Sequence, residues 1–132
     1  MVQTPVNADF TGDPSVDPVT IEYLEESELL LRSVMKLEPT SVEDLADAKR
    51  IARRQLVALD QRKQAVAEVQ PLVKTMNKYE LVLRDIRNLD RRPHADDITD
   101  IKNRIERTRL ISHLTVFQPK PAASEVAPGL ER

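Results

Sequence analysis

Three groups of residues in this sequence have types and spacings that could do chemistry: an aspartate cluster, two histidines and two clusters of basic residues. Asp96, Asp97 and Asp100 follow an Asp-Asp-x-x-Asp pattern, in which carboxylates about one helical turn apart can share a magnesium ion. The same residues also suit the start of a helix, where carboxylates accept from free backbone N–H groups and complement the helix dipole. We expect the capping role, because a chain so poor in aromatic residues offers little from which to build a ligand cavity.

The other residue types that carry catalysis are sparse or absent from the sequence. His94 and His113 are the only histidines, and neither has a partner four residues away with which to begin a zinc site. Cysteine is absent, which excludes thiolate metal sites and cysteine nucleophiles. The sequence also has no Gly-x-Ser-x-Gly elbow and no glycine-rich phosphate loop. It therefore predicts a protein that is not an enzyme and binds no cofactor, metal or small-molecule substrate.

Two basic clusters are the best candidates for binding a partner. Arginine and lysine can contact phosphates along nucleic acid, but the isoelectric point is about 5.7 and no aromatic residue stands among the clusters for base stacking. A simpler interpretation is that they pair with acidic residues, within the chain or between subunits. A plain solvated surface is the third alternative. The cluster residues are Lys49, Arg50, Arg53 and Arg54, then Arg84, Arg87, Arg91 and Arg92.

The net charge of -2 hides a strong separation of charge along the 132 residues. Residues 1–48 carry eleven acidic and two basic residues, whereas residues 49–120 carry seventeen basic and nine acidic ones. Such segregation affects association and solubility more than it affects the fold. It favours contacts in which complementary charges set the orientation of partners.

The elements that must position these residues are predicted to be helices, because no glycine occurs between Pro18 and Phe117. Asp17 and Pro18 suit the cap and first position of a helix over 18–37. Pro39 ends that helix, a second helix runs over about 41–92, and a third over about 97–117. We therefore expect a single all-helical domain over 18–117.

A seven-residue apolar repeat along the second helix predicts coiled-coil-like packing. Its positions are Leu45, Ala52, Leu59, Val66 and Val73, with Ala48, Val69, Met76 and Leu83 as partners. Gln55, Arg62 and Glu80 interrupt this repeat. Pro71 is expected to kink the helix, with a break into two helices as the alternative. The predicted fold is an extended helical hairpin, a three-helix arrangement around a long, kinked central helix.

The two ends of the chain are predicted to be flexible arms. Residues 1–17 are rich in loop formers, and residues 118–132 are rich in proline. Phe10 could dock in a partner's pocket. A two-helix hairpin leaves apolar faces uncovered, which predicts self-association or docking on a larger complex. The residues expected to contact a partner are Phe10, Leu24, Leu31, Met35, Leu110, Leu114 and Phe117.

The leading functional hypothesis is a non-enzymatic structural subunit that oligomerises or docks on a larger complex, such as a virion component of the capsid, neck or tail. The alternative is a nucleic-acid-binding or packaging accessory protein that uses the basic clusters. Residues 1–10 lack the basic and apolar segments of a secretory signal, and no apolar run is long enough to span a bilayer. A cytoplasmic or virion location, without membrane contact, is therefore expected.

Overall fold

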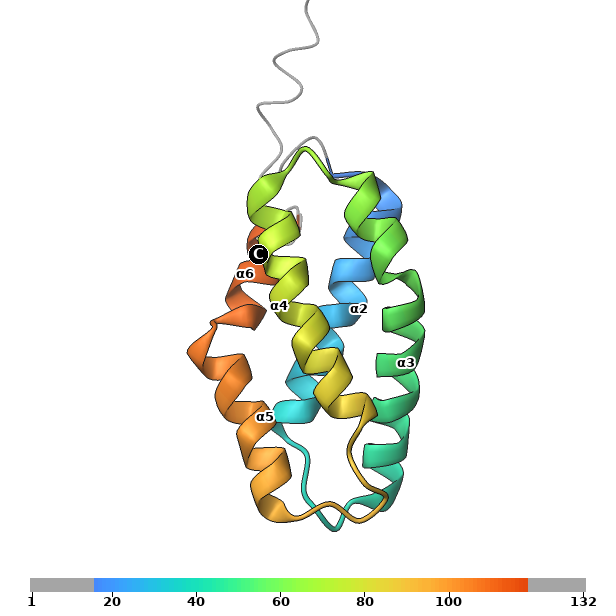
Figure 1. Ribbon diagram of the computed structural model, residues 1–132, viewed down its shortest axis with the longest axis vertical. Coiled ribbons are helices and arrows are strands. Elements are labelled where there is room, and N and C mark those ends of the chain that lie inside the picture. Colours follow the sequence, from blue (N-terminus) through green and yellow to red (C-terminus); the bar gives the residue numbers. More distant parts are fainter. Residues whose placement is uncertain (1–15, 119–132) are drawn as a thin grey trace, which may run out of the picture.

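The protein folds as a bundle of antiparallel helices, which confirms the all-α prediction (Figure 1). The structure is a computed structural model that describes residues 16–118, and those residues contain helices and no strand. Phe10 and most of the two predicted arms lie outside the described residues. The helices are α2 (Pro18–Met35), α3 (Val42–Ala65), α4 (Gln70–Arg87), α5 (Ala95–Arg107) and α6 (Leu110–Val116).

The helices close a ring of four sides. α2 packs on α3, α3 on α4, and α4 on both α5 and α6, which in turn pack on α2. The short helices α5 and α6 follow one another along the same side and together act as the fourth helix (Figure 1). The arrangement is the up-down-up-down topology of a four-helix bundle, in which short connections join antiparallel neighbours.

The prediction of one long helix kinked at Pro71 is wrong, because the chain breaks and reverses before that residue. α3 ends at Ala65 and α4 begins at Gln70, so Pro71 lies in the first turn of α4. A proline is well tolerated there, because the first N–H groups of a helix have no partner inside it. Val66 and Val69 of the connection are buried and anchor the reversal in the core. The molecule is therefore a bundle and not an extended hairpin.

The predicted third helix is also two helices. Thr108 and Arg109 separate α5 from α6, and Arg109 has a left-handed backbone conformation with φ 53° and ψ 39°. In one continuous helix, Ile105 and Leu110 would point roughly 140° apart. The break rotates the chain so that both side chains enter the same core, where each is buried. The apolar side chains of both α5 and α6 thus face one interior.

The seven-residue repeat correctly identifies the core-facing positions of α3 and α4, even though the helix it was expected to form is divided. All of its residues are buried except Val73, which is partly buried against the core. The three polar interruptions have polar partners. Arg62 lies between Asp17 and Thr20 of the α2 start, with its Nη1 3.1 Å from Thr20 Oγ1. Glu80 of α4 accepts from Lys63 Nζ of α3 at 3.2 Å.

Gln55, the remaining interruption, lies in the centre of the bundle. Its side-chain oxygen accepts from the Tyr79 hydroxyl at 2.8 Å and lies 2.6 Å from the Ser27 hydroxyl. Its backbone oxygen accepts from the Tyr23 hydroxyl at 2.8 Å. The Gln55 amide donates to Glu26 at 2.6 Å. One side chain thus links α2, α3 and α4, and both its oxygen and its nitrogen, which would be costly to bury alone, have hydrogen-bond partners.

The bundle covers apolar surface that the hairpin would have left exposed. Leu24 and Leu31 of α2 and Leu110 and Leu114 of α6 are buried in the chain's own interior. Met35 and Phe117 are partly buried against that core. The expectation that these residues form a docking face is therefore corrected, because α2 and α6 pack on one another. No helix within residues 16–118 has both the length and the apolar character needed to span a membrane.

Candidate functional site

A groove with basic walls lies between the first half of α3 and the connection from α4 to α5. It has a volume of about 520 Å³. All of the charged side chains that line it are cationic, and its remaining lining residues are aliphatic. The cationic residues are Lys49 and Arg53 of α3 with Arg91 and Arg92 of the connection, and the aliphatic residues are Val42, Leu45 and Ala46.

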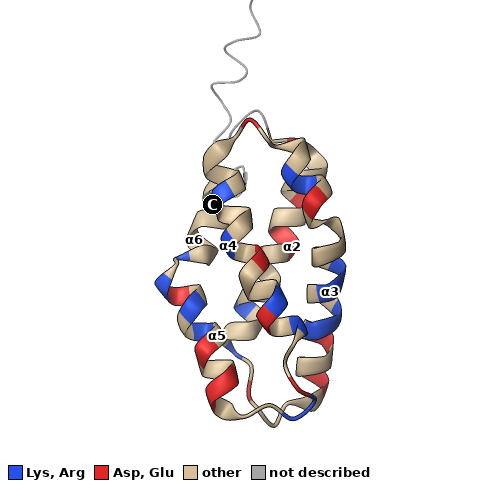
Figure 2. Ribbon diagram, viewed as in Figure 1, with Lys and Arg blue, Asp and Glu red and all other residues tan. Residues whose placement is uncertain are grey.

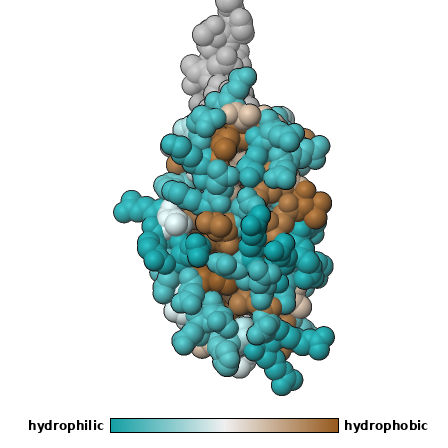
Figure 3. All heavy atoms as spheres, viewed as in Figure 1, coloured by the Kyte–Doolittle hydropathy of each residue, from teal (hydrophilic) through white to brown (hydrophobic). Residues whose placement is uncertain are grey.

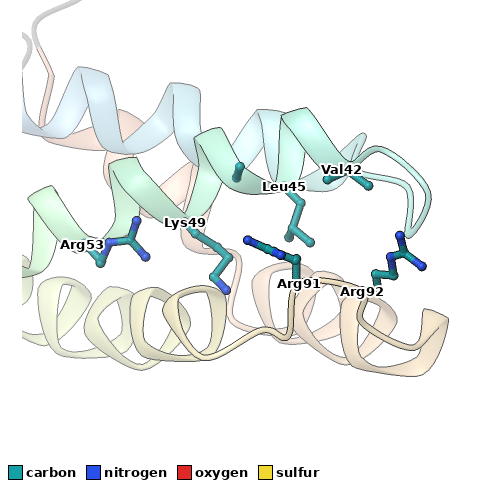
Figure 4. A pocket seen from close by; sticks show the side chains of 7 residues that line it. Val42, Leu45, Lys49, Arg53, Arg91 and Arg92 are labelled. Atoms are coloured by element: carbon teal, nitrogen blue, oxygen red, sulfur yellow. The ribbon is translucent and has the colours of Figure 1, made fainter.

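The two sides of this basic groove are joined by Lys49. Its ammonium group donates to the backbone oxygen of Leu89, just beyond the C-terminal end of α4. Figure 4 shows Lys49 projecting from α3 toward the neighbouring segment, Arg91 reaching back from that segment toward α3, and Arg53 alongside α3. The hydrogen bond holds the α4–α5 connection against α3 and so fixes the width of the groove at this point.

Arg53, Arg91 and Arg92 are free to meet an external anion. All three are exposed, and within residues 16–118 none of them forms an ion pair or a side-chain hydrogen bond. Three guanidinium groups around one concave surface repel each other unless an anion lies between them. Guanidinium is suited to bidentate pairing with carboxylate or phosphate. The groove therefore presents guanidinium groups whose chemistry suits a carboxylate or a phosphate.

The other residues of the predicted basic clusters have different surroundings. Arg50 pairs with Asp47 at 2.9 Å, Arg54 pairs with Glu26, and Arg84 pairs with Glu80 at 2.5 Å. Arg87 is exposed and donates to the side chain of Asn88 at 3.4 Å. Of the sequence clusters, some residues are thus paired with acidic residues within the chain and others line the groove, while Arg87 does neither.

The groove itself was not anticipated, because it depends on the reversal before Pro71. In the expected continuous helix, Lys49 and Arg91 would lie at opposite ends of a rod. In the bundle α3 and α4 run antiparallel, which brings the start of α3 beside the end of α4. Val42, Leu45 and Ala46, the aliphatic floor, carried no functional signal in the sequence. If Pro71 is placed in the first turn of a helix, the sequence predicts that the two basic clusters lie close together.

The aspartates and histidines noted in the sequence lie at the start of α5 and on α6. His94 is the N-cap of α5, and its backbone N–H donates to the Asp97 side chain at 3.3 Å. Asp97 thus takes part in starting α5, although the helix begins at Ala95 and not at residue 97. His113 is a half-buried residue of α6. Within residues 16–118, no three potential metal ligands are grouped so as to hold a metal ion.

Charge is unevenly distributed around this end of the bundle. Figure 2 shows acidic residues gathered on the first turns of α5, and basic residues across the middle of α3. On the face seen in Figure 3, hydrophilic side chains cover most of the surface and hydrophobic ones form separate patches. The fold and the basic groove together define a helical bundle with a surface groove lined by cationic and aliphatic side chains. Comparison with protein-family models, curated proteins and solved structures found no match to this chain.

Proposed function

We propose that the protein is a non-enzymatic assembly module, whose basic groove docks on an acidic surface of a protein partner. The observation that carries this proposal is the convergence of Lys49, Arg53, Arg91 and Arg92, from two segments about forty residues apart in the sequence, around one groove. The charges are presented on a rigid scaffold, since Lys49 ties the connection to α3. A surface preorganised in this way loses little conformational entropy on binding.

The aliphatic floor favours a protein partner over nucleic acid. Val42 is 48% exposed in the described structure, and it contributes an apolar contact that a phosphate backbone would not use. None of the residues that line the groove is aromatic, so it offers no stacking platform for bases. An acidic residue, Asp90, lies next to Arg91 in the sequence. It interrupts the continuous basic track that a nucleic-acid strand would follow.

The proposed role keeps the sequence-based hypothesis of a subunit that docks on a partner, but it depends on a different observation. Self-association was expected because a thin hairpin would leave apolar faces uncovered, but the bundle covers them. The present proposal depends on charge and not on uncovered apolar surface. A place in a larger structural assembly, including a virion, stays a prediction.

The test is binding of a labelled acidic peptide, measured by fluorescence anisotropy on the full chain. A double substitution, Arg53→Glu with Arg91→Glu, should weaken peptide binding at least tenfold, since it reverses two charges of the groove. The matched control is Lys74→Glu with Lys78→Glu, the same charge change at two exposed positions of α4 away from the groove. Equal binding by the groove variant and the wild type would refute the proposal.

Nucleic acid is tested in the same assay. A DNA oligomer of the same charge as the peptide should bind more weakly than the peptide. If the DNA binds more tightly, and Arg53→Glu with Arg91→Glu abolishes that binding with a steep dependence on salt, then the groove serves nucleic acid and the assembly proposal fails.

A further inference from the structure

We infer that the acidic surface that fits the basic groove belongs to a second copy of this chain, so that the protein forms a symmetric dimer through its α4–α5 end. This inference rests on the proposed function, for which it names the partner. It is carried by a second groove of opposite charge on the same end of the molecule.

The second groove lies between the end of α4 and the first half of α5 and has a volume of about 360 Å³. Its lining contains four aspartates and a single cationic side chain, that of Arg104. The basic groove, in contrast, is lined by four cationic side chains and no carboxylate. The lining residues that carry charge in this acidic groove are Asp85, Asp90, Asp97, Asp100 and Arg104.

Two of these aspartates are available to a partner. Arg104 neutralises Asp85, with Nε 3.1 Å from Oδ2, and Asp97 accepts from the backbone N–H of His94. Asp90 and Asp100 are exposed, and neither forms an ion pair or a side-chain hydrogen bond within the described part of the chain. They are the counterparts of Arg53 and Arg91, which are likewise exposed and without a partner there.

The position of the two grooves permits each to meet its opposite on a second copy. The α4–α5 connection separates them: Asp90 lines the acidic groove, and the next residue, Arg91, lines the basic groove. In a dimer with twofold symmetry, a contact of one residue with another is repeated with the roles of the chains exchanged. A twofold axis near this connection therefore places both basic grooves against both acidic grooves at once.

The floors of the two grooves are also alike. Leu45 lies in the basic groove, and Leu89 and Ile101 lie in the acidic one. An exposed ion pair alone adds little to affinity, but two reciprocal grooves form a network in which each charge contacts more than one opposite charge. Complementary potentials of this kind set register and association rate more than affinity. We therefore expect a weak dimer that dissociates as salt screens the charges.

The experiment is sedimentation velocity on the full chain over a range of concentrations, at about 50 mM and about 500 mM salt. The wild type should show concentration-dependent dimers at low salt, with a dissociation constant at least tenfold weaker at high salt. Two charge-reversal variants are compared with it. The basic-groove variant is Arg53→Glu with Arg91→Glu, and the acidic-groove variant is Asp90→Lys with Asp100→Lys.

Each variant alone should be monomeric, because the attraction between its grooves is lost: the substitutions bring the basic groove from four positive charges to no net charge, and they turn the acidic groove from net negative to net positive. An equimolar mixture of the two should restore dimers, since one pair of grooves keeps its original opposite charges. In the other pair the substituted side chains, glutamates on one chain and lysines on the other, are again opposite in charge. Lys74→Glu with Lys78→Glu should dimerise like the wild type. Circular dichroism should show native helix content in each variant, because the substituted side chains make no ion pair within the described bundle.

Other outcomes separate the dimer from the proposed function. A wild type that is monomeric at all concentrations at low salt overturns the dimer, as does an acidic-groove variant that still dimerises. If the basic-groove variant nevertheless loses binding to the acidic peptide, the proposed function survives with a different protein as partner. If the peptide binds that variant as well as it binds the wild type, the proposed function fails too.

Discussion

Tyr23 and Tyr79 meet edge to face in the centre of the bundle, with ring centroids 6.4 Å apart and ring planes at 86°. They belong to α2 and α4, which lie diagonally opposite one another and otherwise have α3 between them (Figure 1). Both hydroxyls donate to Gln55 of α3, one to its backbone oxygen and one to its side chain. This arrangement fixes the rotation of three helices about their axes, because a rotated helix would leave a buried polar group unpaired.

The buried tyrosines predict how the protein responds to alkali. Burial raises the pKa of Tyr79 well above its ordinary value of 10.0, and burial likewise raises the pKa of Tyr23. The folded state thus holds the phenolic protons more tightly than the unfolded state. Its stability is intact below about pH 10 and falls as pH rises above that value, where only the unfolded chain ionises.

We expect tyrosine absorbance near 295 nm and helical circular dichroism to change together in an alkaline titration. The chain contains two tyrosines, so the signal comes from these residues alone. Ionisation of either one near pH 10 without loss of helix would contradict the burial of the pair.

The polar centre also predicts the effect of substitutions. Tyr79→Phe should lower the free energy of unfolding by about 1 kcal/mol, since one buried hydrogen bond is lost. Gln55→Leu should cost more, about 2 kcal/mol, because it leaves the Tyr79 hydroxyl without its acceptor. Urea denaturation followed by circular dichroism measures both. Gln64→Leu, at an exposed position of the same helix, should change stability by less than about 0.5 kcal/mol. A Gln55→Leu variant more stable than the wild type would show that the network does not stabilise the fold.

The sequence predicted those features of the fold that depend on neighbouring residues in the chain, and it did not predict those that depend on tertiary contacts. The helical class, the Asp17 cap and the buried positions of α3 and α4 follow from local composition and periodicity, and the structure has all of them. The reversal before Pro71 did not follow, because a proline in the first turn and a proline in a kink look alike in one sequence. Its cause is tertiary, namely the burial of Val66 and Val69 against other helices.

The candidate site was predictable only in its parts. Composition identified Lys49, Arg53 and Arg91 as basic residues of interest, but equally identified Arg50, Arg54 and Arg84, which have acidic partners in the fold. Which arginines are paired depends on the three-dimensional neighbours of α3, such as Glu26 of α2. The groove required the antiparallel pairing of α3 with α4, and so it could not be derived before the reversal was known.

The bundle and the expected hairpin make opposite predictions for the leucines of α6. Leu110 is fully buried in the bundle, so Leu110→Ala should lower the free energy of unfolding by about 2–5 kcal/mol. The control is Leu29→Ala on α2, where the side chain is 66% exposed and the change should be within about 0.5 kcal/mol. Thermal and urea denaturation at low protein concentration compare the two. Equal, small effects would favour a fold in which α6 does not pack on the chain's own core.

The break between α5 and α6 predicts an unusual response at Arg109. A residue other than glycine in the left-handed region costs roughly 1 kcal/mol, and a β-branched residue costs more. Arg109→Gly should therefore leave stability unchanged or raise it by up to about 1 kcal/mol, despite the greater freedom of glycine in the unfolded chain. Arg109→Val should lower it by about 1–2 kcal/mol. The comparison of the two variants in urea isolates the backbone effect, since both remove the same side-chain charge. Equal free energies of unfolding for Arg109→Gly and Arg109→Val would argue for one continuous helix.

The start of α2 predicts a specific contribution to acid sensitivity. The side chain of Asp17 accepts from the Thr20 N–H at 3.1 Å and from the Thr20 hydroxyl at 2.6 Å, and the hydroxyl bond lowers the pKa of Asp17 below its ordinary value of 3.8. The unfolded chain therefore binds this proton more tightly, so the contribution of Asp17 to stability is complete above about pH 4 and is lost as pH falls through the lower pKa of the folded state.

Asp17→Asn keeps a capping oxygen but removes the charge at the helix N-terminus, and near pH 7 it should lower the free energy of unfolding by about 0.5 kcal/mol. That difference from the wild type should shrink as pH falls below 3.8, and it should vanish once the Asp17 carboxyl is protonated in the folded as well as the unfolded chain. Asp60→Asn, at an exposed position of α3, should show no such convergence. A stability difference between wild type and Asp17→Asn that stays constant from neutral to acidic pH would show that Asp17 is not the charged cap that the structure describes.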